Sequence, residues 1–400
     1  MQIEATSQND LIEERSPAWG AVYALSLGAF ALIASEFMPV SLLTPIAADL
    51  GVSEGQAGQA ISVSGAFAVV TSLFISASVG DLDRKRLLLA LTALMIVSGA
   101  IVAFAPSYLV FMIGRALIGI VIGGFWSMSA ATAMRLVRAE QVPKALAILN
   151  GGNALATIIA APAGSFLGSL IGWRGAFFCV VPVAAVVLVW QMASLPPMKV
   201  PRVARSRNVF ALLRRRIVAL GMAATGVFFM GQFALFTYLR PFLETAAHAD
   251  PATLSFILLA MGVSGFIGSS FIGSLLKDGL YRTLIVIPAV MAAVGAALVA
   301  FDGALMATVL LLGVWGLLAT AAPVGWWSWL SRTLPQEAEA GGGLMVAIIQ
   351  LAITFGATVG GVLFDAGGYR PTFGAGAAML VLAAALAATT ARASRLAQDE

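Results

Sequence analysis

The chain of 400 residues has almost none of the side chains that metal sites and disulfides need. It contains one cysteine, Cys179, and one histidine, His248. A single cysteine cannot form an internal disulfide, and neither residue has companions at the spacing of a metal site. The chain also lacks the phosphate-loop motif GxxxxGK(S/T) and a usable serine–histidine–aspartate set. We therefore expect no enzyme, no bound metal, no cofactor and no direct use of ATP.

Charged residues are scarce as well. They make up 10% of the chain, against 60% hydrophobic residues, and the mean hydropathy is +0.96. A soluble domain typically has about 25% charged residues. The composition excludes a water-soluble protein and indicates an integral membrane protein.

What the sequence does contain is a series of long apolar segments. About 20 apolar residues suffice to cross a bilayer as a helix. Twelve segments reach or approach that length: 18–42, 59–80, 87–105, 108–134, 144–171, 176–194, 217–238, 254–276, 283–301, 304–329, 341–364 and 373–391. The sequence therefore predicts an all-α membrane protein with twelve transmembrane helices.

The basic residues predict how these helices are oriented. Cytoplasmic loops retain an excess of Lys and Arg. Of the 23 basic residues, all but four fall in segments on the side of the N-terminus. The exceptions are Arg174, Arg240 and Arg370 on the opposite side and Arg115 within a span. We therefore expect both termini to face the cytoplasm.

The two halves of the chain repeat one another. Seven residues recur at a constant offset of 196 positions. They are Ala161, Gly164, Leu167, Gly172, Trp173, Arg174 and Phe177, which return as Ala357, Gly360, Leu363, Gly368, Tyr369, Arg370 and Phe373. Together with six spans on each side of a central loop, this predicts a parallel duplication whose substrate site lies near the midplane between the halves.

This duplication also predicts the domain boundaries. Residues 18–194 and 217–391 are expected to form two six-helix bundles related by a pseudo-two-fold axis, with cytoplasmic tails at 1–17 and 392–400. The loop 195–216 holds seven basic residues and no acid. We interpret it as a cytoplasmic linker lying against anionic lipid headgroups, and expect no nucleic-acid partner.

One acidic residue, Glu36, lies well inside a span, and Arg115 is the one base that does so. A charge at that depth is costly and marks a functional site by default. Counted from the ends of their spans, both residues lie about 9–11 Å deep, at 1.5 Å per residue. Pro39 should kink the helix beside the acid, because it cannot donate to the carbonyl of Ser35.

We interpret these two charges as an ion pair that drives transport. Burial and a neighbouring guanidinium act in opposite directions on the proton affinity of a carboxyl group, so small movements can change its protonation. Glu36 is predicted to carry the proton of an antiporter, with Arg115 as its counterweight. The alternative is a static ion pair that holds the first and fourth spans together.

Several stretches together resemble the drug:proton antiporters of the major facilitator superfamily. They are EFMPVSLLTPIAADLGVSEG (36–55), DRKR (83–86), GRALIG (114–119), GGFW (123–126), APAG (161–164) and GWR (172–174). The resemblance implies the major facilitator fold and a place in the bacterial inner membrane. It also implies that Asp83 and Arg84 belong to a cytoplasmic gate and that Arg115 belongs to a proton-relay segment. The gate loop is shorter here than the family pattern.

The same resemblance implies that Ala161, Pro162 and Gly164 form the antiporter motif of the fifth span, with Ala161 where glycine is usual. Four further stretches resemble members that export purine ribonucleosides: SEFMPVSLLTPIAADLGVSEGQAGQ, GGFWSMSA, VPKALAI and GQFALFTYLRP. The function implied is export of purine ribonucleosides or their analogues in exchange for protons.

Polar and aromatic residues within the spans are candidates for the substrate cavity, because amides can bond base edges and rings can stack on a purine. They are Trp126, Asn150, Asn153, Gln232, Phe233, Phe236 and Gln350. Two alternatives stay open: efflux of drugs or sugars by the same mechanism, and a membrane sensor or scaffold that transports nothing. We expect a monomer in contact with lipid, protons and one small-molecule substrate.

Overall fold

The computed structural model describes residues 17–79, 82–198, 209–335 and 337–399, and within these ranges every regular element is a helix. The elements are α2 (Trp19–Leu50), α3 (Glu54–Val79), α4 (Arg84–Ala103), α5 (Tyr108–Arg135), η1 (Ala139–Gln141), α6 (Val142–Phe178), α7 (Val180–Ser194), η2 (Val209–Arg214), α8 (Arg216–Phe236), α9 (Leu239–Thr245), α10 (Pro251–Ala300), α11 (Leu305–Thr333), α12 (Ala338–Gly367) and α13 (Tyr369–Asp399). The predicted all-α membrane fold is confirmed.

Eleven segments of the described chain are long and apolar enough to span a membrane. One of them, Val142–Ser194, contains both α6 and α7, so it accounts for two of the twelve predicted crossings. The spans predicted at 254–276 and 283–301 are the two arms of α10, which bends at Gly279. The first span is longer than predicted, because α2 continues past residue 42 to Leu50 through Pro39 and Pro45.

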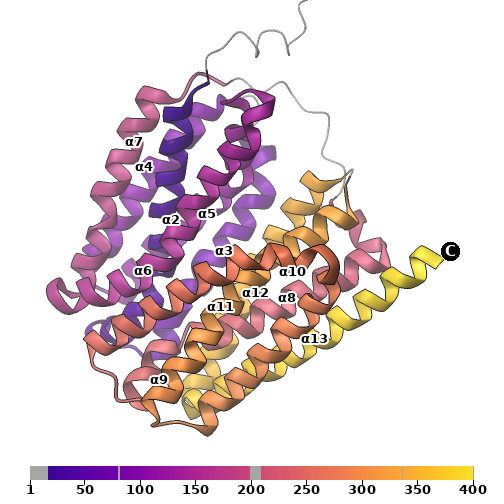
Figure 1. The fold of residues 1–400 in the computed structure, drawn as a ribbon. Helices are drawn as coiled ribbons and strands as arrows, with labels where there is room; N and C mark the ends of the chain where they lie inside the picture. Colours follow the sequence, from indigo (N-terminus) through magenta and orange to yellow (C-terminus); the bar gives the residue numbers. More distant parts are fainter. Residues whose placement is uncertain (1–16, 80–81, 199–208, 336, 400) are drawn as a thin grey trace, which may run out of the picture.

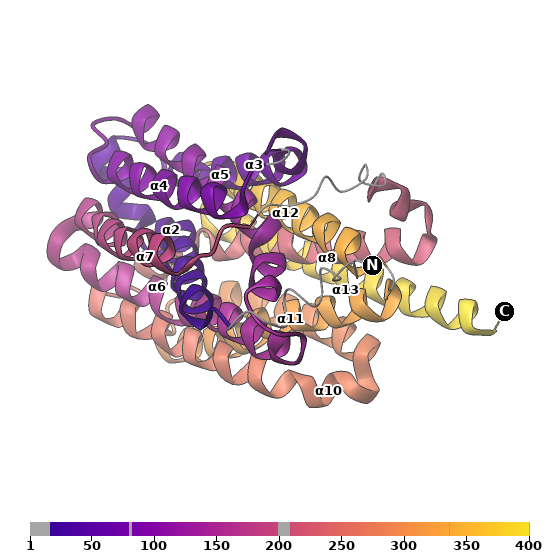
Figure 2. The same cartoon turned by 90° about the horizontal axis from the view of Figure 1, so that it is seen from above.

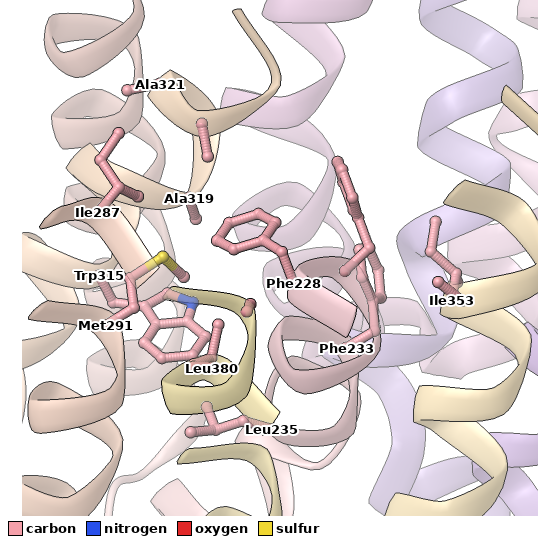
Figure 3. Close-up of a cluster of buried hydrophobic side chains, with 14 of the residues drawn as sticks. Phe228, Phe233, Leu235, Ile287, Met291, Trp315, Ala319, Ala321, Ile353 and Leu380 are labelled. Carbon is pink, nitrogen blue, oxygen red and sulfur yellow. The ribbon is translucent and has the colours of Figure 1, made fainter. Parts of the chain in front are cut away.

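The helices gather in two groups, which we call the N-half (α2–α7) and the C-half (α8–α13). The two groups occupy opposite sides of the molecule in both views (Figures 1 and 2). Buried apolar side chains likewise form two clusters, one mainly in each half. In the C-half cluster, Phe228, Met291, Trp315 and Leu380 bring α8, α10, α11 and α13 together (Figure 3).

Two pairs of long helices join the halves: α3 packs against α12, and α6 packs against α10. Short α9 of the C-half also packs against α2. We call the end of the molecule that carries α9 the α9 end (Figure 1). A Cβ on Gly262 of α10 would lie 2.8 Å from the carbonyl oxygen of Ile158 on α6, so glycine permits this close backbone approach.

The sequence repeat marks two turns at the α9 end. Gly172 and its counterpart Gly368 both have positive φ, at 75° and 71°. With ψ of 164° and −156°, both lie in a backbone region open essentially only to glycine. Each glycine breaks the helical path and is followed by an aromatic residue and an arginine, Trp173-Arg174 and Tyr369-Arg370.

Gly172→Ala should therefore destabilise the protein through its backbone alone. No atom of the described residues outside the local backbone lies within 4 Å of a Cβ built at Gly172, so the expected cost of about 1–3 kcal/mol comes from the forced φ. Thermal unfolding in detergent measures it. Gly151→Ala is the matched control, because its Cβ would also meet no neighbour in the part of the chain that the structure describes, and its φ is not positive. Equal losses of thermal stability in the two variants would contradict the assignment of the cost to the positive φ of Gly172.

Candidate functional site

Arg115 of α5 is completely buried and is held by oxygen atoms of two neighbouring helices. Its Nη1 donates to the carbonyl oxygen of Ser35 at 2.8 Å, and its Nη2 donates to that of Glu36 at 2.9 Å. The same side chain donates to the carbonyl oxygen of Ala60 and to the hydroxyl of Ser64, both at 3.3 Å. None of these four acceptors, which lie on α2 and α3, is a carboxylate.

Pro39 explains why Arg115 contacts the backbone of α2. Proline has no N–H, so the carbonyl of Ser35, four residues earlier, lacks its usual helical donor. The guanidinium supplies that donor. The sequence predicts an ion pair between Arg115 and the Glu36 carboxylate. The structure instead brings the arginine to the main-chain oxygen of Glu36, because the proline leaves an unsatisfied acceptor beside it.

The carboxylate of Glu36 points toward the other half of the protein. The side chain is 4% exposed, and its Oε1 accepts a long hydrogen bond of 3.4 Å from Nε2 of Gln350 on α12. The sequence assigns Gln350 to the substrate cavity. The structure adds that Gln350 contacts Glu36, the one acidic side chain buried within the described spans.

Beside Glu36, an aromatic cluster joins α2 to α8. Phe37 stacks on Phe233 with ring centroids 5.6 Å apart, and Phe236 meets both rings edge-on at 6.5 and 5.8 Å. Gln232 lies one turn before Phe236 on the same face of α8. It is 9% exposed, and its Oε1 has no hydrogen-bond partner within the described chain. Sequence analysis found Gln232 and the C-half rings but missed Phe37, whose position next to Glu36 was the available signal.

Three other predicted cavity residues lie elsewhere. Asn150 on α6 is exposed and donates to the carbonyl of Leu146 in its own helix. Asn153 is half-buried one turn further along α6. Trp126 on α5 packs edge-on against Phe125. Among the contacts recorded for the described residues, none joins these three side chains to the aromatic cluster, so their place in the cavity stays a prediction.

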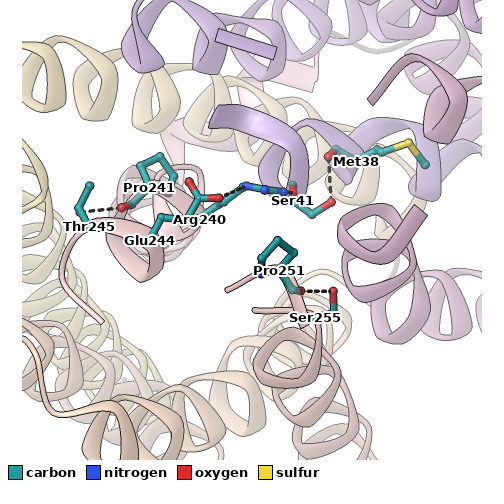
Figure 4. A network of polar contacts seen from close by, with 8 residues as sticks. All are labelled: Met38, Ser41, Arg240, Pro241, Glu244, Thr245, Pro251 and Ser255. Carbon is teal, nitrogen blue, oxygen red and sulfur yellow. Dashed lines mark hydrogen bonds and ion pairs between the residues drawn. The ribbon is translucent and has the colours of Figure 1, made fainter. Parts of the chain in front are cut away.

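A second arginine repeats the arrangement of Arg115 nearer the α9 end. Pro45 leaves the carbonyl of Ser41 without a helical donor, and Nη1 of Arg240 donates to that oxygen (Figure 4). Arg240 belongs to α9 of the C-half and is steadied by Glu244, 2.7 Å from its Nε. The sequence predicts Arg240 outside the spans, on the side opposite the N-terminus, and does not indicate this contact. Both proline-freed carbonyls of α2 are thus occupied by arginines, one from each half.

The residues assigned by family resemblance contact the N-half and the segment that follows α7. Asp83 caps α4 by accepting from the backbone N–H of Lys85 at 2.8 Å, and it also accepts from the N–H of Met198 at 2.9 Å. The backbone N–H of Arg84 donates to the carbonyl of Met198.

The motif residues Ala161, Pro162 and Gly164 lie on α6, and a Cβ on Gly164 would meet the hydroxyl of Ser41 on α2. The gating role of Asp83 and Arg84 and the antiport role of these motif residues stay predictions.

Comparison with known proteins gives consistent results over nearly the whole chain. A family model described as Major Facilitator Superfamily matches residues 25–345. A Pseudomonas aeruginosa protein named Transcription regulatory protein OpdE is 59% identical over 383 residues, which is 95% of this chain and 95% of its own. The purine ribonucleoside efflux pump NepI of Salmonella paratyphi B is 39% identical over 376 residues, 94% of this chain and 95% of its own.

Solved structures show the same fold at low sequence identity. A bacterial homolog of the human lysosomal transporter Spinster, in an inward-facing and unoccupied conformation, aligns with a TM-score of 0.73 and 15% identity, covering 94% of this chain and 97% of that one. The human organic anion transporter MFSD10 aligns with a TM-score of 0.66 and 16% identity, covering 93% and 100%. The family match, the relative from Salmonella paratyphi B and the fold agree, and the chain belongs to the major facilitator superfamily of multi-pass membrane transporters.

Proposed function

We propose that this protein exports purine ribonucleosides in exchange for protons, with Glu36 as the proton carrier. The observation that carries the proposal is the Glu36 carboxylate, buried between the halves and bonded by Gln350 of the C-half. Protonation of a group in that position changes a contact between the two bodies that must move in alternating access. Arg115 acts as a fixed positive charge, since four oxygen atoms hold it in place.

The aromatic cluster beside Glu36 supports a purine as the substrate. Phe37, Phe233 and Phe236 offer ring faces for stacking, and Gln232 offers a buried amide oxygen that has no hydrogen-bond partner among the described residues. The name of the relative from Salmonella paratyphi B agrees with this chemistry. We propose further that both termini lie in the cytoplasm of a bacterial inner membrane, so that the α9 end faces outward.

The direct test uses purified protein in sealed proteoliposomes. An imposed proton gradient should drive uptake or release of labelled purine ribonucleosides, with weaker transport of pyrimidine ribonucleosides, pentoses and lipophilic cations. Preference for pentoses or cations over nucleosides would favour drug or sugar efflux instead. Thermal stabilisation of the purified protein by the same compounds gives an independent measure of binding.

A second candidate function is that of a membrane sensor or scaffold that controls gene expression. The name of the 59% identical relative from Pseudomonas aeruginosa favours it. Such a protein would bind a ligand and produce no flux in sealed vesicles under any gradient. Nucleoside flux driven by protons through the wild-type protein would contradict it.

Phe236→Leu should weaken nucleoside binding about tenfold, because it removes a stacking face while it keeps an apolar side chain of similar size. The midpoint of a thermal-shift titration with adenosine measures the change. Phe74→Leu is the matched control, since Phe74 on α3 is 60% exposed and lies outside the cluster. Unchanged affinity in Phe236→Leu would remove the cluster from the binding site.

A further inference from the structure

The turn of α12 that carries Gln350 is seated directly on α3. The carbonyl oxygen of Gln350 accepts from the hydroxyl of Thr354 at 2.9 Å, and that hydroxyl also lies 3.3 Å from the carbonyl of Ser62 on α3. A Cβ on Gly65 would come within 3.2 Å of the Gln350 carbonyl and 2.3 Å of the Thr354 hydroxyl. Gly65 thus lets α12 approach closely at the level of Glu36.

From Gln350, polar contacts with α3 continue along one face of α12 to the α9 end. Thr358 donates to the hydroxyl of Ser62 at 2.9 Å and lies 3.2 Å from Oε1 of Gln59. Further along, Asp365 accepts from the hydroxyl of Ser53 at 2.6 Å and from the N–H of Gly55 at 2.9 Å. Positions 350, 354, 358 and 365 share a helical face. This polar stripe, residues 350–365 of α12, therefore starts at the Glu36 carboxylate and ends where the halves meet at the α9 end.

The hydrogen bond from Gln350 depends on the charge of Glu36. An amide N–H bonds an ionised carboxylate about twice as strongly as a neutral acceptor. The charged group facing Glu36 is Arg115 of α5, which its four oxygen acceptors hold in either protonation state. Three charged side chains on helices packed against α2 contact it away from Glu36, at its ends or in its α9-side half: Lys144 at Trp19, Arg240 at Ser41 and Arg174 at Asp49.

We propose that Gln350 is the positioning residue that prevents the empty, charged transporter from switching conformation. This role rests on the proposed function, because antiport fails if the carrier reorients with neither proton nor substrate bound. Gln350 holds α12 to the Glu36 carboxylate in that state. Either protonation of Glu36 or a substrate that takes the place of Gln350 on the carboxylate removes the contact and frees the halves to move.

Gln350→Met tests the proposal, because it keeps the length of the side chain and removes the N–H donor. Proteoliposomes with this variant should show a substrate-independent proton leak several-fold above wild type, read with an internal pH dye, and a smaller nucleoside gradient at the same driving force. Thr358→Val is the matched control. It removes a contact of the same stripe away from Glu36 and should keep the wild-type leak.

A wild-type leak in Gln350→Met, or an equal leak in Thr358→Val, would overturn the proposal while the proposed function stands. Gln350→Ala serves as a second variant if Gln350→Met fails to fold, and the same outcomes apply to it. Wild-type protein that moves no nucleoside under a proton gradient would instead refute the proposed function, and the role of Gln350 with it. The two failures are therefore told apart by the wild-type measurement.

Discussion

Glu36→Gln is expected to abolish proton-driven transport. With one proton exchanged for one neutral nucleoside, a membrane potential of 100 mV supplies about 2.3 kcal/mol, which supports a gradient of about 50-fold. A glutamine has nearly the same shape but cannot release a proton. The variant should therefore build no nucleoside gradient, with equal concentrations on the two sides of the membrane. Nucleoside accumulation in proteoliposomes under a potassium-diffusion potential measures both values.

The control for this prediction is Glu140→Gln, at an exposed position in η1. It should keep the wild-type gradient. Purified Glu36→Gln should also keep its thermal stability within a few degrees, because the amide fits the same space beside Gln350. If a folded Glu36→Gln variant still builds a nucleoside gradient that depends on the potential, the Glu36 carboxyl is not the proton carrier. A wild-type gradient that ignores the potential would contradict the one-for-one stoichiometry.

Arg115→Gln is expected to destabilise the protein strongly, because it leaves several buried carbonyl oxygens of α2 and α3 with too few donors. Each unsatisfied buried group costs about 1–3 kcal/mol. Part of that loss depends on Pro39. In a Pro39→Ala background the new backbone N–H can donate to the carbonyl of Ser35, so removal of the arginine should cost less. Thermal unfolding of wild type, both single variants and the double variant gives the coupling.

The second proline of the same helix provides the matched control. Pro45→Ala restores a donor to the carbonyl of Ser41, which Arg240 and not Arg115 occupies. It should leave the cost of Arg115→Gln unchanged, whereas Pro39→Ala should reduce it by about 0.5–3 kcal/mol, the usual range for residues in contact. If Pro39→Ala and Pro45→Ala change the cost of Arg115→Gln equally, or if neither changes it, then Arg115 does not act by satisfying the carbonyl that Pro39 frees.

Most of the fold could be predicted from local properties of the sequence. Apolar segments of about 20 residues cross the bilayer as helices, because a helix satisfies the polar groups of its backbone within the segment itself. The constant offset between Gly172 and Gly368 likewise predicted equivalent positions in the two halves, and both prove to be turns with positive φ. Boundaries were less accurate: α2 runs through two prolines, since arginines from other helices satisfy the carbonyls that the prolines free.

The partners of the site residues could not be predicted in the same way. Glu36 and Arg115 stood out because they are charged residues within apolar spans, and their similar depth favoured a direct ion pair. The structure gives the guanidinium to backbone oxygens and the carboxylate to Gln350, 314 positions away in the chain. Depth along a helix is set by residue number, but the choice of partner depends on helix rotation and on which acceptors are left unsatisfied.

By itself, the sequence determined that this protein is a membrane-spanning helical bundle with one acid and one base well inside its apolar spans. Those features follow from composition and periodicity, which act locally. Only the tertiary structure decided that the acid faces the C-half, that Phe37 completes an aromatic cluster with Phe233 and Phe236, and that two arginines satisfy the carbonyls freed by two prolines. Such contacts join helices far apart in the chain, and packing alone sets their distances and orientations.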